Sequence, residues 1–248
     1  MGIINKLFSS GKSKKPADLS VLSADMHSHF IPNIDDGSQS FKDSVRYIKR
    51  LQEVGYKKII TTPHIMHDYY KNTPEIIAAG LENLIRAVEN EGIDIQLEAA
   101  AEYLLDGGFE DLINEGKLLT FGEQYLLIEL SYFNAPANLK EIIFNLQISG
   151  YKVILAHPER YTYWFNNFKI YEELKDRNVF FQLNTISLSG YYSPIVKKMA
   201  EKLVDLKMID FLGTDMHNEN YLDGLEKTLY EKYLFKVIET NKLLNNTL

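Results

Sequence analysis

The sequence contains no cysteine, which excludes disulfides, iron–sulfur clusters, cysteine-ligated zinc and a cysteine nucleophile. It has no apolar run long enough to cross a bilayer. It also lacks an excess of basic residues, and its net charge of -7 argues against nucleic-acid binding, which leaves a basic footprint. What is present is a chain of 248 residues, 45% hydrophobic and 12% aromatic, enough to bury a substantial core. These features lead us to expect a cytoplasmic protein.

Residues 1–19 differ from the rest of the chain, because they are basic but have no signal-peptide core or cleavage site. The lysines here are Lys6, Lys12, Lys14 and Lys15. We expect a flexible basic leader, followed by a single domain over residues 20–248. The alternative is a short amphipathic membrane anchor, assisted by the lysines at an anionic surface. Its apolar side chains would be Ile3, Ile4, Leu7 and Phe8.

Short apolar runs alternate with longer amphipathic runs through the rest of the chain. We expect strands at 21–27, 58–62, 95–102, 126–130, 153–157, 180–184 and 211–215. We expect helices at 40–53, 74–91, 136–149, 168–177, 194–206 and 225–243, with a shorter one at 109–115. Pro74, Pro136 and Pro194 fit the first turn of a helix, where a missing N–H costs nothing. This alternation predicts an α/β fold of parallel strands with crossover helices.

Five of the six histidines stand at or just beyond the ends of predicted strands. They are His27, His29, His64, His157 and His217. Neutral imidazole is the commonest protein ligand for metals. A barrel would bring the carboxyl ends of all strands to one face, whereas an open sheet would spread them along a line. The need for one shared site therefore favours the barrel.

Four carboxylates accompany these histidines: Asp36, Glu102, Glu129 and Asp215. Nine donors are too many for one ion and enough for two or three, and their mixed chemistry suits manganese, iron or zinc. Each residue alone has a structural alternative: Asp36 in a turn, Glu129 paired with a buried base, or a histidine in a local hydrogen bond. The sixth histidine, His67, is expected at the rim and not among the ligands.

The motifs that carry these donors, taken in order, resemble the PHP (polymerase and histidinol phosphatase) superfamily from about residue 22 onward. They are Asp25-Met26-His27-Ser28-His29, Thr62-Pro63-His64, Ala101-Glu102, Ile128-Glu129, Ala156-His157-Pro158-Glu159-Arg160 and Asp215-Met216-His217-Asn218. In detail the sequence is most similar to the bacterial capsule and exopolysaccharide protein-tyrosine phosphatases. The features that carry this closer similarity are Asp35-Asp36-Gly37 and the His157-Pro158-Glu159-Arg160 run.

The resemblance implies a distorted (β/α)7 TIM-like barrel, the PHP fold, with a trinuclear centre that is often loaded with manganese. It also implies hydrolysis of phosphotyrosine on a bacterial tyrosine kinase that controls polysaccharide synthesis and export. The nine candidate ligands match the family's ligand positions one by one, and Arg160 matches a phosphate-binding arginine. One departure is a second arginine, absent here from residues 219–224, for which Lys197 or Lys198 is a candidate replacement.

Two further parts of the site are left open by the sequence. The candidates for the general acid are His67, Asp68 and a metal-bound water. A set of loop aromatics could surround the mouth of the site, pack the loops or form an oligomer interface: Tyr69, Tyr70, Tyr161, Tyr163, Trp164, Phe165, Tyr191 and Tyr192.

Three functions compete with phosphotyrosine hydrolysis. They are a small-molecule phosphatase with a substrate like histidinol phosphate, a phosphoesterase acting on nucleic acid and a non-catalytic metal-binding scaffold. The negative net charge disfavours the nucleic-acid enzyme. The complete ligand set disfavours the scaffold.

Overall fold

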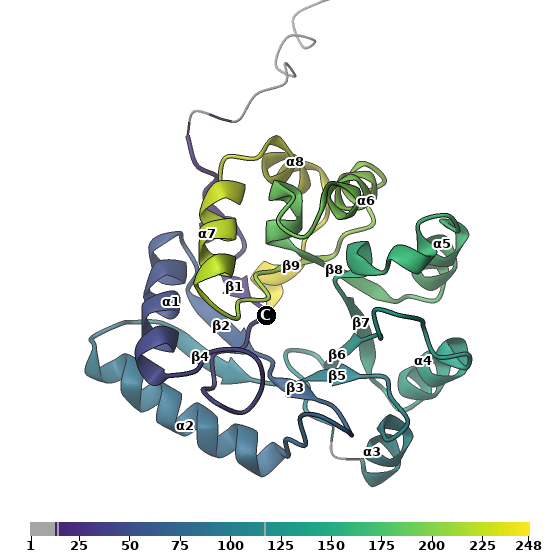
Figure 1. The fold of residues 1–248 in the computed structure, drawn as a ribbon, viewed down its shortest axis with the longest axis horizontal. Coiled ribbons are helices and arrows are strands. Elements are labelled where there is room, and N and C mark those ends of the chain that lie inside the picture. Colours follow the sequence, from purple (N-terminus) through teal and green to yellow (C-terminus); the bar gives the residue numbers. More distant parts are fainter. Residues whose placement is uncertain (1–12, 14, 117) are drawn as a thin grey trace, which may run out of the picture.

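The computed structural model describes residues 13, 15–116 and 118–248 as a ring of parallel strands with helices around it (Figure 1). The strands are β1 (Ala24–Asp25), β2 (Lys58–Thr61), β3 (His64–Ile65), β4 (Gln96–Ala99), β5 (Glu102–Leu104), β6 (Tyr125–Glu129), β7 (Lys152–Ala156), β8 (Phe180–Asn184) and β9 (Phe211–Gly213). They pair in the orders β1-β2-β4 and β3-β5-β6-β7-β8-β9. Every strand pairing in these two sheets is parallel, as the α/β prediction requires.

Two of the barrel strands are interrupted. Thr61 is opposite Ala99 where β2 pairs with β4, and His64 is opposite Glu102 where β3 pairs with β5. Pro63 lies in the first gap and has no N–H to donate to a ladder. The predicted continuous strand at 95–102 is therefore wrong, since β4 and β5 are separate. Counted with their continuations, these strands give the ring seven strands, which confirms the predicted distorted (β/α)7 barrel.

The ring closes between β9 and β1, where backbone hydrogen bonds continue beyond the ends of both strands. The N–H of Asp215 donates to the carbonyl of His27 at 2.8 Å, and the N–H of His29 donates to the carbonyl of Met216 at 3.0 Å. Ser28 and Met216 form a parallel bridge between these hydrogen bonds. The closure thus brings together the two motifs that are most distant in the sequence.

Helices connect successive strands and cover the outside of the barrel (Figure 1). They are α1 (Phe41–Glu53), α2 (Pro74–Asn90), α3 (Phe109–Glu115), α4 (Leu139–Ile148), α5 (Lys169–Asp176), α6 (Pro194–Asp205), α7 (Glu219–Thr228) and α8 (Lys232–Thr240). Pro74 and Pro194 occupy first turns as predicted, behind the capping side chains of Thr73 and Ser193. Pro136 does not, because α4 begins only at Leu139.

The predicted helix at 225–243 is also wrong, since α7 and α8 are separated at Leu229–Glu231. The carbonyls at this break accept hydrogen bonds from the N-terminal segment: Ala17 N–H reaches Leu229 at 2.7 Å and Ser13 N–H reaches Tyr230 at 2.9 Å. A continuous helix would use these carbonyls internally.

The N-terminal segment joins the domain earlier than predicted, because Ala17 and Leu19 are buried. The expected boundary after residue 19 therefore falls inside a packed segment. Of the predicted flexible leader at residues 1–19, residues 1–12 and 14 lie outside the described residues, and so do the apolar side chains of the alternative membrane anchor. Among the described helices, none combines the length and apolar character needed to cross a membrane.

The barrel interior is apolar in its lower part, beneath the carboxyl ends of the strands. Met26, Ile60, Leu127, Ile154 and Phe211 form its centre. Leu244 and Leu248 pack against this cluster from below, and the C-terminus lies near the middle of the ring in Figure 1. Along each strand, side chains point alternately into the barrel and out of it. The buried polar side chains lie at the opposite end of the barrel interior, near the carboxyl ends of the strands.

Asn245 completes the closure at the lower end. Its buried side-chain amide accepts from Leu212 N–H at 2.9 Å and donates to the carbonyls of Leu212 and Ala24 at 2.7 and 3.0 Å. It therefore joins β9 to β1 where these strands share no regular ladder.

We predict that Asn245→Ala lowers the free energy of unfolding by about 2–4 kcal/mol, because buried backbone groups lose their partners. Urea unfolding of the variant and the parent protein measures the difference. The matched control is Asn246→Ala, since Asn246 is the next residue and is exposed; it should change stability by less than about 0.5 kcal/mol. Equal effects of the two substitutions would contradict a role for Asn245 in closure.

Candidate metal centre

All nine predicted donors meet at the upper end of the barrel, where the strands end or are interrupted. Eight of them are at most 7% exposed, and the ninth, Asp36, is exposed on the solvent side. His27, His29 and Asp36 come from the segment after β1, and Asp215 and His217 from the segment after β9. The remaining four are His64, Glu102, Glu129 and His157. They belong to or directly follow β3, β5, β6 and β7.

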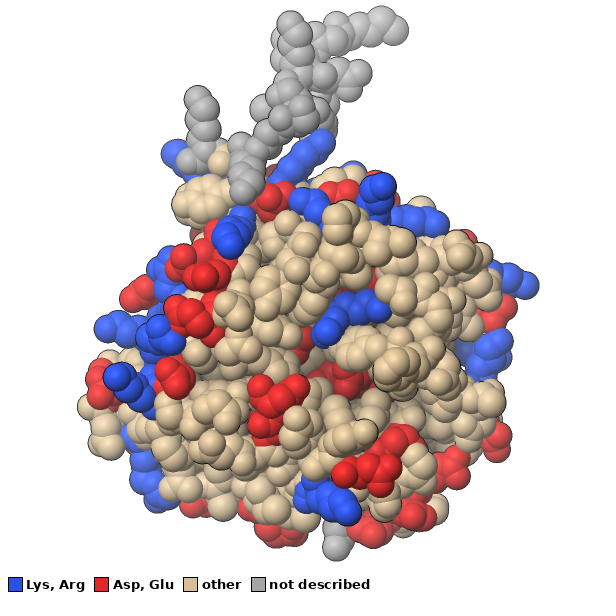
Figure 2. All heavy atoms as spheres, in the orientation of Figure 1, with Lys and Arg blue, Asp and Glu red and all other residues tan. Residues whose placement is uncertain are grey.

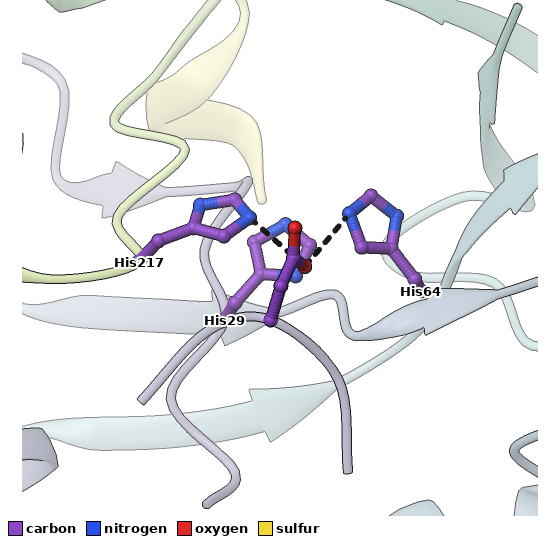
Figure 3. A group of neighbouring side chains, drawn as sticks. His29, His64 and His217 are labelled. Carbon is purple, nitrogen blue, oxygen red and sulfur yellow. Dashed lines mark ion pairs between the residues drawn. The ribbon is translucent and has the colours of Figure 1, made fainter. Parts of the chain in front are cut away.

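The outer part of this cluster is built around Asp36. Its Oδ1 lies 3.4 Å from His64 Nε2 and 3.5 Å from His217 Nε2. Figure 3 shows how close the rings of His29, His64 and His217 lie to one another, and its dashed lines mark ion pairs within this group. These four residues offer ligand atoms that all lie within 4.8 Å of one another, a spacing that allows one shared ion.

The inner part is built around Glu102. Its Oε2 lies 3.1 Å from both His27 Nε2 and His64 Nδ1, and its Oε1 lies 3.1 Å from His157 Nε2. Asp215 Oδ1 approaches His27 Nε2 at 3.3 Å, and Glu129 Oε1 approaches His157 Nε2 at 3.5 Å. The donors therefore form two further groups, His27–His29–Glu102–Asp215 and His64–Glu102–Glu129.

The protonation of three histidines is fixed by acceptors behind them. Nδ1 of His27 lies 2.8 Å from Gln182 Oε1, Nδ1 of His29 lies 2.8 Å from Asp35 Oδ2, and Nδ1 of His217 lies 2.7 Å from a backbone carbonyl. A proton on each Nδ1 satisfies these acceptors and leaves the Nε2 lone pair directed into the cluster. These rings are thereby held in the tautomer that binds a metal.

The close approach of so many lone pairs indicates that this cluster binds cations. Nε2 of His27 and Nε2 of His29 are only 3.3 Å apart, and both face the carboxylates of Glu102 and Asp215. Glu102 Oε2 and His64 Nδ1 are buried without a hydrogen-bond partner. Buried polar atoms without partners are costly, so lone pairs that converge in this way call for positive charge among them.

The electrostatics of the inner group agree with this need. Burial opposes ionisation of Glu102, but the charges of His27 and His64 outweigh it and hold its pKa well below the usual range. The pKa of His27 is raised to about 9: burial lowers it, and the charges of Glu102 and Asp215 more than compensate. Burial and the charge of Glu102 raise the pKa of Glu129. Without metal, protons therefore supply part of the positive charge that the carboxylates require.

A cavity of about 140 Å³ opens above the cluster. Its walls include seven of the donors together with Arg160, Met66, Tyr132 and Tyr221. Arg160 Nη1 lies 3.3 Å from Asp215 Oδ2, which places the guanidinium beside the donors. In Figure 2 acidic and basic atoms both lie near the centre of a mostly uncharged face.

Two cavity residues, Tyr132 and Tyr221, were missed by the sequence reasoning. Tyr132 follows the end of β6 by three residues, and Tyr221 follows His217 by four. Their positions just beyond strand-end motifs were the available signal. Of the predicted aromatics, Tyr161 and Trp164 are buried and pack the loops, whereas Tyr192 contacts Arg160.

Four other predicted residues lie away from the cavity. His67 and Asp68 are exposed, and the ring of His67 rests against Gly108. Lys197 pairs with Glu231 at 3.0 Å, and Lys198 is exposed on α6. His67, Asp68 and the two candidate replacement lysines are thus absent from the residues that line the cavity, which leaves a metal-bound water as the remaining candidate for the general acid.

Comparisons with known proteins agree with the geometry. Tyrosine-protein phosphatase YwqE of Bacillus subtilis (strain 168) is 28% identical over 229 residues, which cover 89% of this chain and 90% of the relative. Tyrosine-protein phosphatase CpsB of Streptococcus pneumoniae is 26% identical over 202 residues, covering 78% and 82%. The putative tyrosine-protein phosphatase CapC of Staphylococcus aureus is 27% identical over 195 residues, covering 78% and 76%.

Solved structures give the same result for the fold. A chain from the crystal structures of YwqE and CpsB, described as unique metal-dependent tyrosine phosphatases, has a TM-score of 0.75 and 27% identity, covering 86% of this chain and 90% of that one. Histidinol phosphate phosphatase from Lactococcus lactis has a TM-score of 0.51 at 16% identity, covering 85% and 92%, a similarity of fold alone.

The comparison that decides the family covers most of the chain. Residues 23–229 match the profile described as "Capsular polysaccharide synthesis, CpsB/CapC". This range contains all nine donors, Arg160 and the whole ring of strands. The chain therefore belongs to the CpsB/CapC family of capsular polysaccharide synthesis.

Proposed function

We propose that this chain is a metal-dependent tyrosine-protein phosphatase of capsular polysaccharide synthesis, which hydrolyses phosphotyrosine on proteins. One observation carries the proposal: five imidazoles and four carboxylates converge beneath a cavity that has Arg160 in its wall. The choice of phosphotyrosine is supported by relatives that align over most of their length and are named tyrosine phosphatases.

The metal centre of this proposal holds two or three divalent ions. Three overlapping donor groups support three ions, with His29, His64 and Glu102 each belonging to two groups. His157 completes the inner part through its approach to Glu102 and Glu129. Manganese is the metal we favour, with iron and zinc as alternatives, because imidazole and carboxylate ligands suit all three.

The residues of the cavity then have separate roles. When bound, the divalent ions supply positive charge to the phosphoryl oxygens and make a water molecule more acidic. Arg160 offers a planar pair of N–H groups to the same phosphoryl group. Tyr221, which also lines the cavity, provides an aromatic face for a substrate ring. The leaving phenolate has a pKa of about 10, so it depends less on a general acid than an alkoxide does.

The substrate partner is a phosphoprotein, and the partner we favour is a bacterial tyrosine kinase of the same capsule system. The cavity of about 140 Å³ admits a phosphorylated side chain and leaves the rest of a polypeptide outside. Nucleic acid is not part of the proposal, because the net charge is -7.

We predict that a phosphotyrosine peptide is the best substrate of the Mn²⁺-loaded protein. Its kcat/KM should exceed that for histidinol phosphate and for a nucleotide diester, since the aromatic wall favours an aryl ester. Phosphate release in parallel assays measures all three. A preference for histidinol phosphate would replace the proposed substrate, and no turnover by protein of confirmed metal content would support the scaffold alternative.

We predict that Glu102→Gln removes metal together with activity. The substitution removes one negative charge from a carboxylate shared by two donor groups, so metal affinity should fall at least about tenfold. Elemental analysis after dialysis gives metal per chain, and phosphatase assays give activity. Glu98→Gln is the matched control, because Glu98 lies on neighbouring β4 and pairs with Lys58. Full metal content in Glu102→Gln would exclude Glu102 as a ligand.

We predict that Arg160→Ala lowers kcat/KM by roughly 30- to 150-fold, equivalent to about 2–3 kcal/mol for a charge-assisted contact. Metal content should stay at the parent level, because the guanidinium donates to Asp215 without being a ligand itself. Steady-state kinetics measures the loss of kcat/KM, and elemental analysis measures the metal content. Arg177→Ala, at an exposed arginine, is the control. Unchanged kinetics in Arg160→Ala would remove this residue from the site.

A further inference from the structure

The guanidinium of Arg160 lies over two tyrosine rings. Its Cζ is 4.5 Å from the centre of the Tyr132 ring and 4.1 Å from the centre of the Tyr192 ring. The two tyrosines come from different parts of the barrel, one after β6 and the other from the segment before α6. Arginine favours such contacts, because its planar cation stacks on aromatic faces.

Each ring is itself attached to the metal centre. The Tyr192 hydroxyl accepts from Asn184 Nδ2 at 3.0 Å and donates to Asp215 Oδ2 at 3.3 Å. The Tyr132 ring stacks on the ring of His157, with 5.9 Å between centres and an interplanar angle of 26°. The position of the guanidinium is thus determined relative to the donors and does not depend on the arginine side chain alone.

The two ring contacts restrict the directions in which the guanidinium can turn. One edge nitrogen already reaches Asp215 at 3.3 Å, which sets the rotation of the plane. Among the described residues that line the cavity, Arg160 alone contributes a lysine or arginine cation. A single cation that grips a phosphoryl group gains most when its geometry is fixed beforehand, because less conformational entropy is lost on binding.

We propose that Tyr132 and Tyr192 are positioning residues that hold the guanidinium of Arg160 in the plane needed to bind a phosphoryl group. The proposal rests on the proposed function only in requiring a phosphate monoester at this centre. It assigns the tyrosines an action through Arg160 and not through direct contact with the phosphoryl group. Recognition of the anion then depends on one oriented arginine.

The first experiment measures the affinity of inorganic phosphate for the Mn²⁺-loaded protein by calorimetry. Tyr132→Leu should weaken phosphate binding about tenfold, because one stacking face is lost. Tyr132→Phe keeps that face and should restore most of the affinity. Phe133→Leu changes the adjacent aromatic, which is 91% exposed, and should have no effect. Leu and Phe variants of equal affinity at position 132 would overturn the proposal, as would parent-level binding in Tyr132→Leu.

A double-mutant cycle separates positioning from direct contact. In the Arg160→Ala background, Tyr132→Leu should cause almost no further loss of kcat/KM for phenyl phosphate, because the group it positions is gone. A further loss of about tenfold in that background would show that Tyr132 acts on the substrate directly and would overturn the proposal. Metal content is measured for every variant, and a reduced content in Tyr132→Leu alone would also count against it.

These measurements do not depend on the identity of the biological substrate. Phosphate is the product of every phosphomonoesterase, and phenyl phosphate lacks any peptide. Failure of the phosphotyrosine peptide assay would leave the effect of Tyr132 on phosphate affinity in place. Conversely, a negative result in the cycle would leave phosphotyrosine hydrolysis standing.

Discussion

Closure of the barrel between its first and last strands is the constraint on which the site depends. His27 and His29 follow β1, whereas Asp215 and His217 follow β9, about 190 residues later in the chain. The backbone bond from Asp215 N–H to the His27 carbonyl sets the relative height of these two segments. The register of this strand pairing therefore determines whether the donors from the two ends of the chain face one another. A shift of the register by one residue would move the side chains of one segment to the other face.

The centre places many donor atoms close together with little positive charge among them. The neighbouring side chains hold the donors in this arrangement. Gln182 and Asp35 fix the rings of His27 and His29 from behind, so their lone pairs cannot turn away. Glu102 stands among imidazoles with one oxygen unpartnered. Such a site lowers the stability of the folded protein unless cations bind in it. Buried, preorganised donors therefore couple metal binding to folding.

The sequence supported much of this description, because strand periodicity and strand-end motifs are local signals. The alternation of elements predicted the barrel, and the histidine motifs predicted which side chains meet. The interruption at Ala100–Ala101 was missed because the apolar pattern runs through it, and β3 was missed because the predicted strand stopped at Thr62. The break near Tyr230 was missed because its cause is a distant partner, the N-terminal segment. Tyr132 was missed for a similar reason: its contact is with Arg160, which lies in the turn after β7.

The position of Asn245 has a consequence for synthesis of the chain. Its side chain joins β9 to β1, so the ring closes completely only after residue 245 has left the ribosome. At about 5–20 residues per second, the interval between emergence of His27 and of Asn245 is about 10–40 s. During that time the first histidines lack the later donors. The nascent protein therefore cannot assemble its whole metal centre before the last strand and Asn245 have emerged.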